Sequence, residues 1–219
     1  MPFVRAINPL NVPSAIAEAP SMSKSEHTHQ ILAILYSDSM AADHSFSDLG
    51  YALRDEGFAV AGIVQINKDN PDREKCDMDV EELASGTVLR ISEDRGKEAM
   101  GCRLDHGALA HAAAILLAAL DDGPELVIVN KFGKVESQGK GLRDAIAKAV
   151  QLGIPTIVGV PYRNVDQWRS FTDGLAEECE SGSPRILEWL EHWRLRPKDE
   201  ALPIFQDECQ ARRSESHGR

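Results

Sequence analysis

The sequence predicts an α/β fold with three layers, in which a doubly wound and mostly parallel sheet lies between helices. Short, almost wholly apolar runs of five to nine residues alternate with stretches whose apolar residues recur every three or four positions. Strands that are apolar at nearly every residue are buried on both faces, so these runs fit a parallel sheet covered by helices on both sides.

Each apolar run is expected to form a strand, and each periodic stretch a helix. The expected strands are Ile31–Tyr36, Phe58–Ile66, Thr87–Ser92, Leu126–Asn130 and Pro155–Val160. The expected helices are Ser45–Glu56, His106–Leu120, Leu142–Leu152 and one that begins at Asn164. Ser45 and Asn164 have capping-box spacing and Asp105 is a good N-cap, while Val80–Ala84 is expected to form a short helical turn.

The net charge of −11 is confined to one part of the chain. Residues 31–180 carry 15 basic and 26 acidic side chains, whereas residues 1–30 and residues 181–219 each sum to zero. We therefore expect a folded domain over 31–180, a flexible N-terminal segment over 1–30, and a C-terminal helix and tail over 181–219. The helix, Ser183–Leu195, either docks on the domain or binds a protein partner.

Composition also excludes some classes of protein. An acidic chain repels phosphate over most of its surface, so a broad nucleic-acid interface is not expected. No apolar run reaches the length of about 20 residues that a membrane span needs. The start of the chain lacks a signal-peptide pattern and the four cysteines form no C-x-x-C pair, so a cytoplasmic protein with reduced thiols is expected.

Three stretches resemble a bacterial domain family of unknown function. They are GCRLD at 101–105, NKFGKVE at 130–136 and GKGLR at 139–143. That family is placed in the P-loop NTPase superfamily, and its genes are often found near molybdate-transport genes. The resemblance covers about residues 31–178, with a more distant similarity to small thermophilic nucleoside triphosphatases. It implies a P-loop-NTPase-like fold and a regulatory role in molybdate metabolism.

The motifs that would hold a nucleotide are altered. A P-loop needs G-x-x-x-x-G-K-[ST] after the first strand, but no Gly lies between Ile31 and Gly50, and no Lys either. Asp38 and Asp43 stand there instead, and each would repel a phosphate by about 1–4 kcal/mol. Asn130 replaces the Walker B acid of the related triphosphatases. Asn130-Lys131-Phe132-Gly133 also resembles the guanine-reading N-K-x-D motif of GTPases, but Gly133 replaces the aspartate that reads the base. We therefore expect degenerate Walker motifs and no catalytic residue.

One short segment of the acidic domain is basic. Residues 131–143 carry four basic side chains and one acid, a local charge of +3, where a buried strand ends. The ligand-binding candidates are Ser37, Ser39, Arg103, Asn130, Lys131, Lys134, Glu136, Lys140 and Arg143. The alternative is a solvated helix face with ion pairs between Lys140, Asp144 and Lys148.

The leading hypothesis is a non-catalytic or weakly catalytic protein that binds an anion or a nucleotide. Its ligand or cofactor would be Mg²⁺ with a nucleotide, or an oxyanion such as molybdate. Two alternatives stay open. One is a residual nucleoside triphosphatase whose Mg²⁺ is held by Glu136 or Asp38. The other is a metal- or oxyanion-binding protein that uses Cys76 and Cys102. A homo-oligomer is also left open.

Overall fold

The computed structural model of the chain describes residues 29–68, 77–93, 104–195 and 202–206. Its centre is one seven-stranded sheet. The strands are β1 (Ile31–Tyr36), β2 (Val60–Lys68), β3 (Asp77–Glu82), β4 (Thr87–Arg90), β5 (Leu126–Val129), β6 (Thr156–Pro161) and β7 (Ala176–Glu180). They lie in the order β4-β3-β2-β5-β6-β1-β7. The last five are parallel, whereas β3 and β4 add an antiparallel edge.

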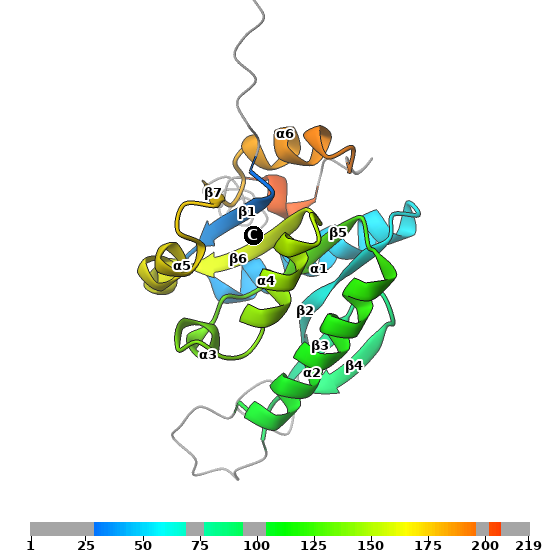
Figure 1. Cartoon of the computed structure of the whole chain (residues 1–219), viewed down its shortest axis with the longest axis vertical. Coiled ribbons are helices and arrows are strands. Elements are labelled where there is room, and N and C mark those ends of the chain that lie inside the picture. The colour runs from blue at the N-terminus through cyan, green and yellow to red at the C-terminus, as the bar shows by residue number, and fades with distance from the viewer. Residues whose placement is uncertain (1–28, 69–76, 94–103, 196–201, 207–219) are drawn as a thin grey trace, which may run out of the picture.

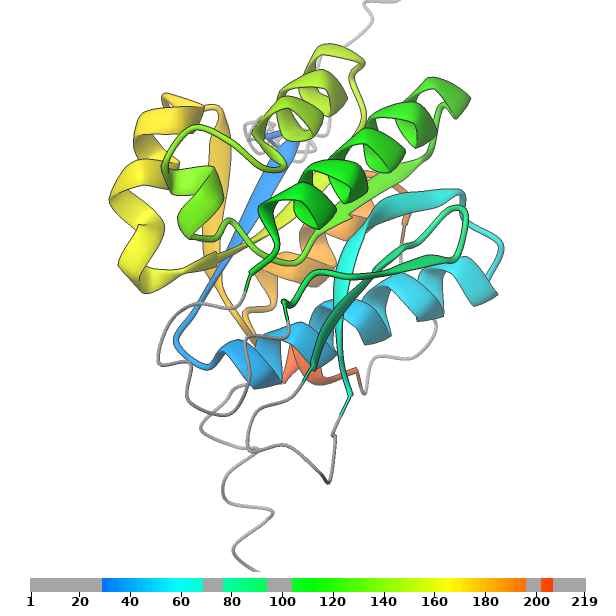
Figure 2. The same ribbon diagram turned by 90° about the horizontal axis from the view of Figure 1, so that it is seen from below.

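Helices cover both faces of the sheet, as Figures 1 and 2 show. The α-helices are α1 (Ser39–Asp55), α2 (His106–Ala119), α3 (Lys134–Ser137), α4 (Arg143–Gln151), α5 (Val165–Thr172) and α6 (Arg185–His192). Short 3-10 turns are η1 (Leu120–Asp122), η2 (Tyr162–Asn164) and η3 (Pro203–Phe205). One hydrophobic cluster joins α2, α4 and α5 to one face of the sheet, and a second joins α1, α6 and η3 to the other.

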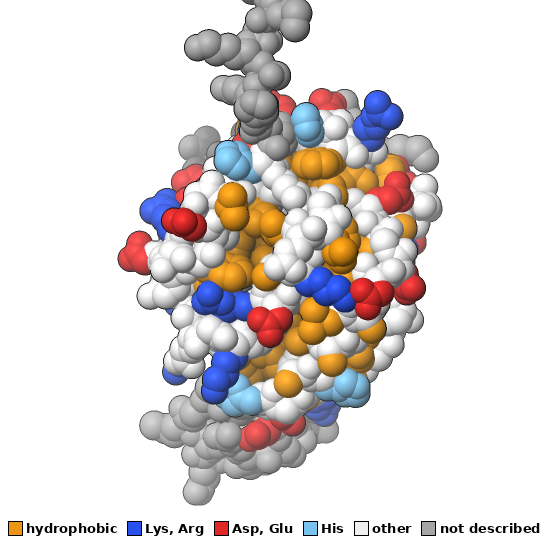
Figure 3. Space-filling view, viewed as in Figure 1, with side chains coloured by type: hydrophobic (Ala, Val, Ile, Leu, Met, Phe, Trp, Pro, Cys, Tyr) orange, Lys and Arg blue, Asp and Glu red, His pale blue; other side chains and the backbone are white. Residues whose placement is uncertain are grey.

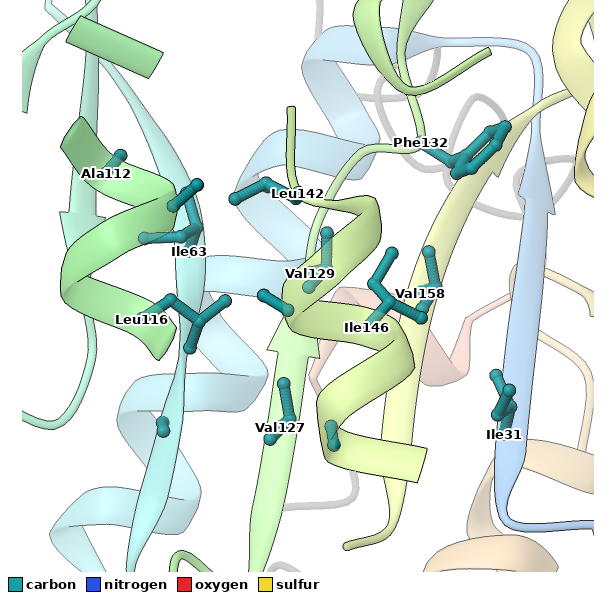
Figure 4. Packing of buried hydrophobic residues seen from close by; sticks show 14 of the residues in the cluster. Ile31, Ile63, Ala112, Leu116, Val127, Val129, Phe132, Leu142, Ile146 and Val158 are labelled. Carbon is teal, nitrogen blue, oxygen red and sulfur yellow. The ribbon is translucent and has the colours of Figure 1, made fainter. Parts of the chain in front are cut away.

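The central strands are apolar throughout because alternate residues enter different clusters. In β5, Val127 and Val129 face α2 and α4, whereas Leu126 and Ile128 face α1. Figure 4 shows the first cluster, with Leu116 of α2 above β2 and Ile146 of α4 between β5 and β6. The predicted mixed α/β fold with a mostly parallel sheet is thereby confirmed.

Several expected elements need correction. Val80–Ala84 is not a helical turn: β3 runs over Asp77–Glu82 and pairs with β2 and β4. The first helix begins at Ser39 rather than Ser45, because Asp38 caps it. A strand over Ala176–Glu180 was not expected, since its sequence AEECE is mostly charged.

The C-terminal helix α6 uses its apolar face inside the protein. Ile186, Trp189 and Leu190 are fully buried in the second cluster. The indole Nε1 of Trp189 donates a hydrogen bond of 2.7 Å to the carbonyl of His29, just before β1. A protein partner for this helix would therefore meet its polar side.

The face of the molecule that carries α2 exposes both apolar and charged side chains (Figure 3). Figure 3 shows apolar side chains gathered over α2 and between the helices, with charged side chains scattered among them. Within the described ranges, no helix combines the length and the apolar character that a membrane crossing requires.

Candidate functional site

The topology marks one position at the edge of the sheet. Strands β1 and β6 are neighbours, but the chain leaves β1 toward α1 on one face and leaves β6 toward α5 on the other. In open α/β sheets, ligands bind at such a switch point, outside the carboxyl ends of the strands. Ser37 directly follows β1, whereas Arg163 and Lys131 are each the second residue after their strands, β6 and the neighbouring β5.

Asp38 closes the start of α1. One of its carboxylate oxygens, Oδ1, accepts hydrogen bonds from the backbone N–H groups of Met40 and Ala41, at 2.9 and 3.2 Å. These amides are the groups that a helix start would offer to a phosphate. The negative charge expected in this loop thus serves as a helix cap, and an anion could reach the amides only by displacing it.

The same arrangement recurs at α2. Asp105, the predicted N-cap, accepts hydrogen bonds from Gly107 and Ala108 at 2.8 and 3.0 Å.

Asp43 and Asn130 form a buried pair below the first loop. The side-chain amide of Asn130 donates to Oδ1 of Asp43 at 2.9 Å, and both residues are 3% exposed. The pair bridges α1 and the end of β5. A buried carboxylate needs such a donor, since an unpaired one is strongly destabilising. Asn130 therefore stabilises a charge on α1 here.

A buried hydroxyl lies at the end of β1. Tyr36 is 1% exposed, and its oxygen has no hydrogen-bond partner among the residues that the structure describes. Burial raises the pKa of this phenol well above its usual value, and the charge of Asp43 raises it further, while Arg163 opposes the shift. Tyr36 is therefore neutral at physiological pH.

Glu136 organises the loop between β5 and α4. Its carboxylate accepts the backbone N–H of Gly133 at 2.9 Å and that of Leu142 at 3.1 Å. The residue is 4% exposed, and burial raises the pKa of its carboxyl, while these hydrogen bonds and Lys131 work against the shift. The start of α4, where a bound anion was expected, is thus held by an internal carboxylate.

The four basic residues of this loop have different surroundings. Lys134 and Lys140 are exposed and Lys131 is half-buried. Arg143 turns toward α5, where its guanidinium carbon lies 4.1 Å from the ring centroid of Phe171. Within the described part of the chain, none of the four forms a direct ion pair.

The ion pairs considered between Lys140, Asp144 and Lys148 are not observed. Lys148 instead donates to Asp121 of η1 and to the carbonyl of Leu117, which ties α4 to α2.

Of the remaining candidates, Ser37 is exposed and Ser39 is half-buried at the first turn of α1. Arg103, Cys76 and Cys102 lie outside the described residues. The described cysteine, Cys179, is unpaired, and burial raises the pKa of its thiol to about 12. No group of three or more His, Cys, Asp or Glu side chains suited to a metal ion occurs in the described ranges.

Sequence reasoning did not single out Arg163 or Phe171. Arg163 stands alone between a predicted strand and a predicted helix, and no motif marks it. Asn164, expected to cap α5, instead donates its amide to the carbonyl of Phe132 at 2.8 Å.

Comparison with known proteins places the chain in a family. The profile of the family described as "Protein of unknown function (DUF2478)" matches residues 31–189. The chain belongs to this family. No solved structure matches the chain.

The chain is also similar to part of one named protein. Over 147 residues, 67% of this chain, the sequence is 34% identical to the molybdenum import ATP-binding protein ModC 2 of Bradyrhizobium diazoefficiens. The chain covers 16% of that protein's length, so the name describes a much longer polypeptide.

Proposed function

We propose that this chain is a ligand-binding domain of P-loop-NTPase ancestry that holds an anion or a nucleotide without hydrolysing it. The hydrogen bond between Asn130 and Asp43 carries the proposal, because it commits the residue in the Walker B position to a buried carboxylate. The similarity to an ATP-binding protein of molybdenum import supports the ancestry.

The ligand site lies at the ends of β5, β6 and β1. Lys131 and Arg163 supply positive charge from adjacent strands, and Ser37 and Ser39 supply hydroxyl groups. Each cation near the surface contributes about 1–4 kcal/mol of attraction to a charge a few ångströms away. Lys134 and Lys140, both exposed, add to the basic rim. Because the starts of α1 and α4 are closed by Asp38 and Glu136, side chains rather than helix amides hold the anion.

The biological role we propose is regulation of molybdate uptake. The support is the printed name of the relative, in which a segment like this chain is part of a longer polypeptide. The ligand is then either a nucleotide or an oxyanion such as molybdate.

Calorimetry tests the site. The chain is titrated with ATP, ADP, phosphate and molybdate, each with and without Mg²⁺. Lys131→Ala and Arg163→Ala should each weaken binding at least tenfold. Lys148→Ala is the matched control, because it removes the same charge from a residue engaged with Asp121. Absence of heat with every ligand, or equal losses in Lys131→Ala and Lys148→Ala, would contradict the proposal.

Phosphate release tests the absence of hydrolysis. A residual triphosphatase would need Asp38 or Glu136 to hold Mg²⁺, yet both carboxylates already accept backbone N–H groups. We expect no ATP turnover above that of a Glu136→Ala protein. Turnover that this substitution abolishes would establish the enzyme instead.

A further inference from the structure

A shallow cleft of about 300 Å³ lies between the start of α4 and the outer side of α5. It is lined by side chains from α3, α4 and α5, namely Ser137, Arg143, Asp166, Gln167, Ser170 and Phe171. Lys131, Arg163 and Ser37 are not among its walls. A volume near the lower end of the usual range for ligand pockets fits a molecule much smaller than a nucleoside triphosphate.

Two contacts within the protein fix the position of the Arg143 guanidinium. It stacks over Phe171 at 4.1 Å, and its Nη1 donates to the carbonyl of Glu136 at 3.4 Å. Phe171 in turn stacks on the buried ring of Phe132, with centroids 5.8 Å apart. A planar fork that is already oriented loses little conformational freedom when it binds a carboxylate.

Two opposite charges, Arg143 and Asp166, line this cleft. Neither Arg143 nor Asp166 forms an ion pair with a residue in the described ranges. Arg169, one turn after Asp166, is occupied elsewhere: it donates three hydrogen bonds of 2.7–3.1 Å to Glu178. The cleft thus offers one fixed cation and one anion to a ligand.

We propose that this cleft binds a small zwitterion of the amino-acid class. The ligand carboxylate pairs with the fork of Arg143, and the ligand ammonium pairs with Asp166. The hydroxyl of Ser170 donates to the ligand carboxylate, and the half-buried ring of Phe171 contacts the ligand side chain. The hydroxyl of Ser137 already donates to the carbonyl of Lys134 at 2.8 Å, so its oxygen can only accept a hydrogen bond from the ligand ammonium. A doubly charged phosphate fits less well, because Asp166 repels it.

Thermal unfolding of the full chain identifies the ligand. Each of the free L-amino acids is added at about 10 mM, roughly ten times a Kd of 1 mM. One or more should raise the unfolding temperature. Calorimetry then compares each hit with its analogue that lacks the amino group and with its analogue that lacks the carboxylate. Both analogues should bind at least tenfold more weakly.

Three variants connect binding to the cleft. Asp166→Asn changes an exposed side chain without altering its size, and should weaken binding at least tenfold. Arg143→Lys keeps the charge but removes the planar fork, and should do the same. Lys131→Ala, outside the cleft, should leave amino-acid binding unchanged. No stabilisation by any amino acid overturns the proposal, as does a hit whose affinity Asp166→Asn leaves intact. Loss of amino-acid binding in Lys131→Ala would overturn it too, since the cleft would then belong to the anion site.

Discussion

Gly141→Ala should destabilise the protein far more than a glycine substitution in a surface loop usually does. Gly141 has φ of +64°, a conformation that costs an alanine about 1–2 kcal/mol. A Cβ at this position would also lie 2.0 Å from Oε1 of Glu136, so the carboxylate must move. Glu136 would then lose one or both of its hydrogen bonds to the backbone of Gly133 and Leu142, at 2.9 and 3.1 Å.

The expected loss follows from adding these effects. Each hydrogen bond to a charged group contributes about 1.5–3 kcal/mol, so the total is about 2.5–5 kcal/mol with one bond lost and about 4–8 kcal/mol with both. Gly139 provides the matched control. It has φ of +87° in the same loop, but no atom lies within 4 Å of an added Cβ. Gly139→Ala should therefore cost only the backbone strain, about 1–2 kcal/mol.

Urea unfolding followed by tryptophan fluorescence measures both variants, since Trp168 is buried beside this loop's Phe132. A double-mutant cycle isolates the cause: in a Glu136→Ala background, the cost of Gly141→Ala should fall to about 1–2 kcal/mol. Equal losses in Gly141→Ala and Gly139→Ala, or strictly additive effects in the cycle, would refute the role assigned to Glu136.

Three further substitutions test the helix starts and the buried polar groups. Asp38→Ala should cost about 1 kcal/mol and free the first amides of α1, so inorganic phosphate should raise its unfolding temperature more than that of the wild type; an equal response to phosphate counts against this. Asn130→Asp sets a second carboxylate against Asp43 and should cost about 2–4 kcal/mol near pH 7, with partial recovery near pH 5 where the two share a proton; urea unfolding at both pH values decides. The third substitution is Glu136→Gln. Burial raises the pKa of the Glu136 carboxyl in the folded wild type, so the wild type loses stability as the pH rises above the ordinary pKa of 4.5, whereas the variant has no carboxyl to titrate there. The difference in free energy of unfolding between the two proteins should therefore shrink over that pH range.

The central strands could be predicted from the sequence because a strand that is buried on both faces is apolar at almost every residue. Every residue of β5 and β6 is buried, so both strands read as unbroken apolar runs. The edge strands have no such continuous apolar run. In β3, Asp79 and Glu82 are buried but bound by Arg90 and by backbone amides, and a run of acids gives no hint of these partners. The strand β7 is half-exposed, and among the described strands it pairs with β1 alone.

For the candidate site, the sequence predicts which loop is involved but not how its side chains are arranged. The order of the elements and the end of the predicted strand are enough to indicate the loop over 131–143. The stacking of Arg143 on Phe171 joins two helices that are distant in sequence, and no local pattern encodes it. The cap of α1 was misplaced for a related reason: Ser45 also had capping spacing, and only the position where β1 ends selects Asp38.

The internal carboxylates at the starts of α1, α2 and α4 also make these three helix starts insensitive to the supply of phosphate ligands. A protein with vacant phosphate-binding amides is stabilised in proportion to the logarithm of ligand concentration, so its folded population follows the supply of that ligand. Here Asp38, Asp105 and Glu136 are covalently attached, and their effective concentration at these amides does not change. The contribution of these three helix starts to the stability of the domain is therefore the same whether nucleotide is scarce or abundant.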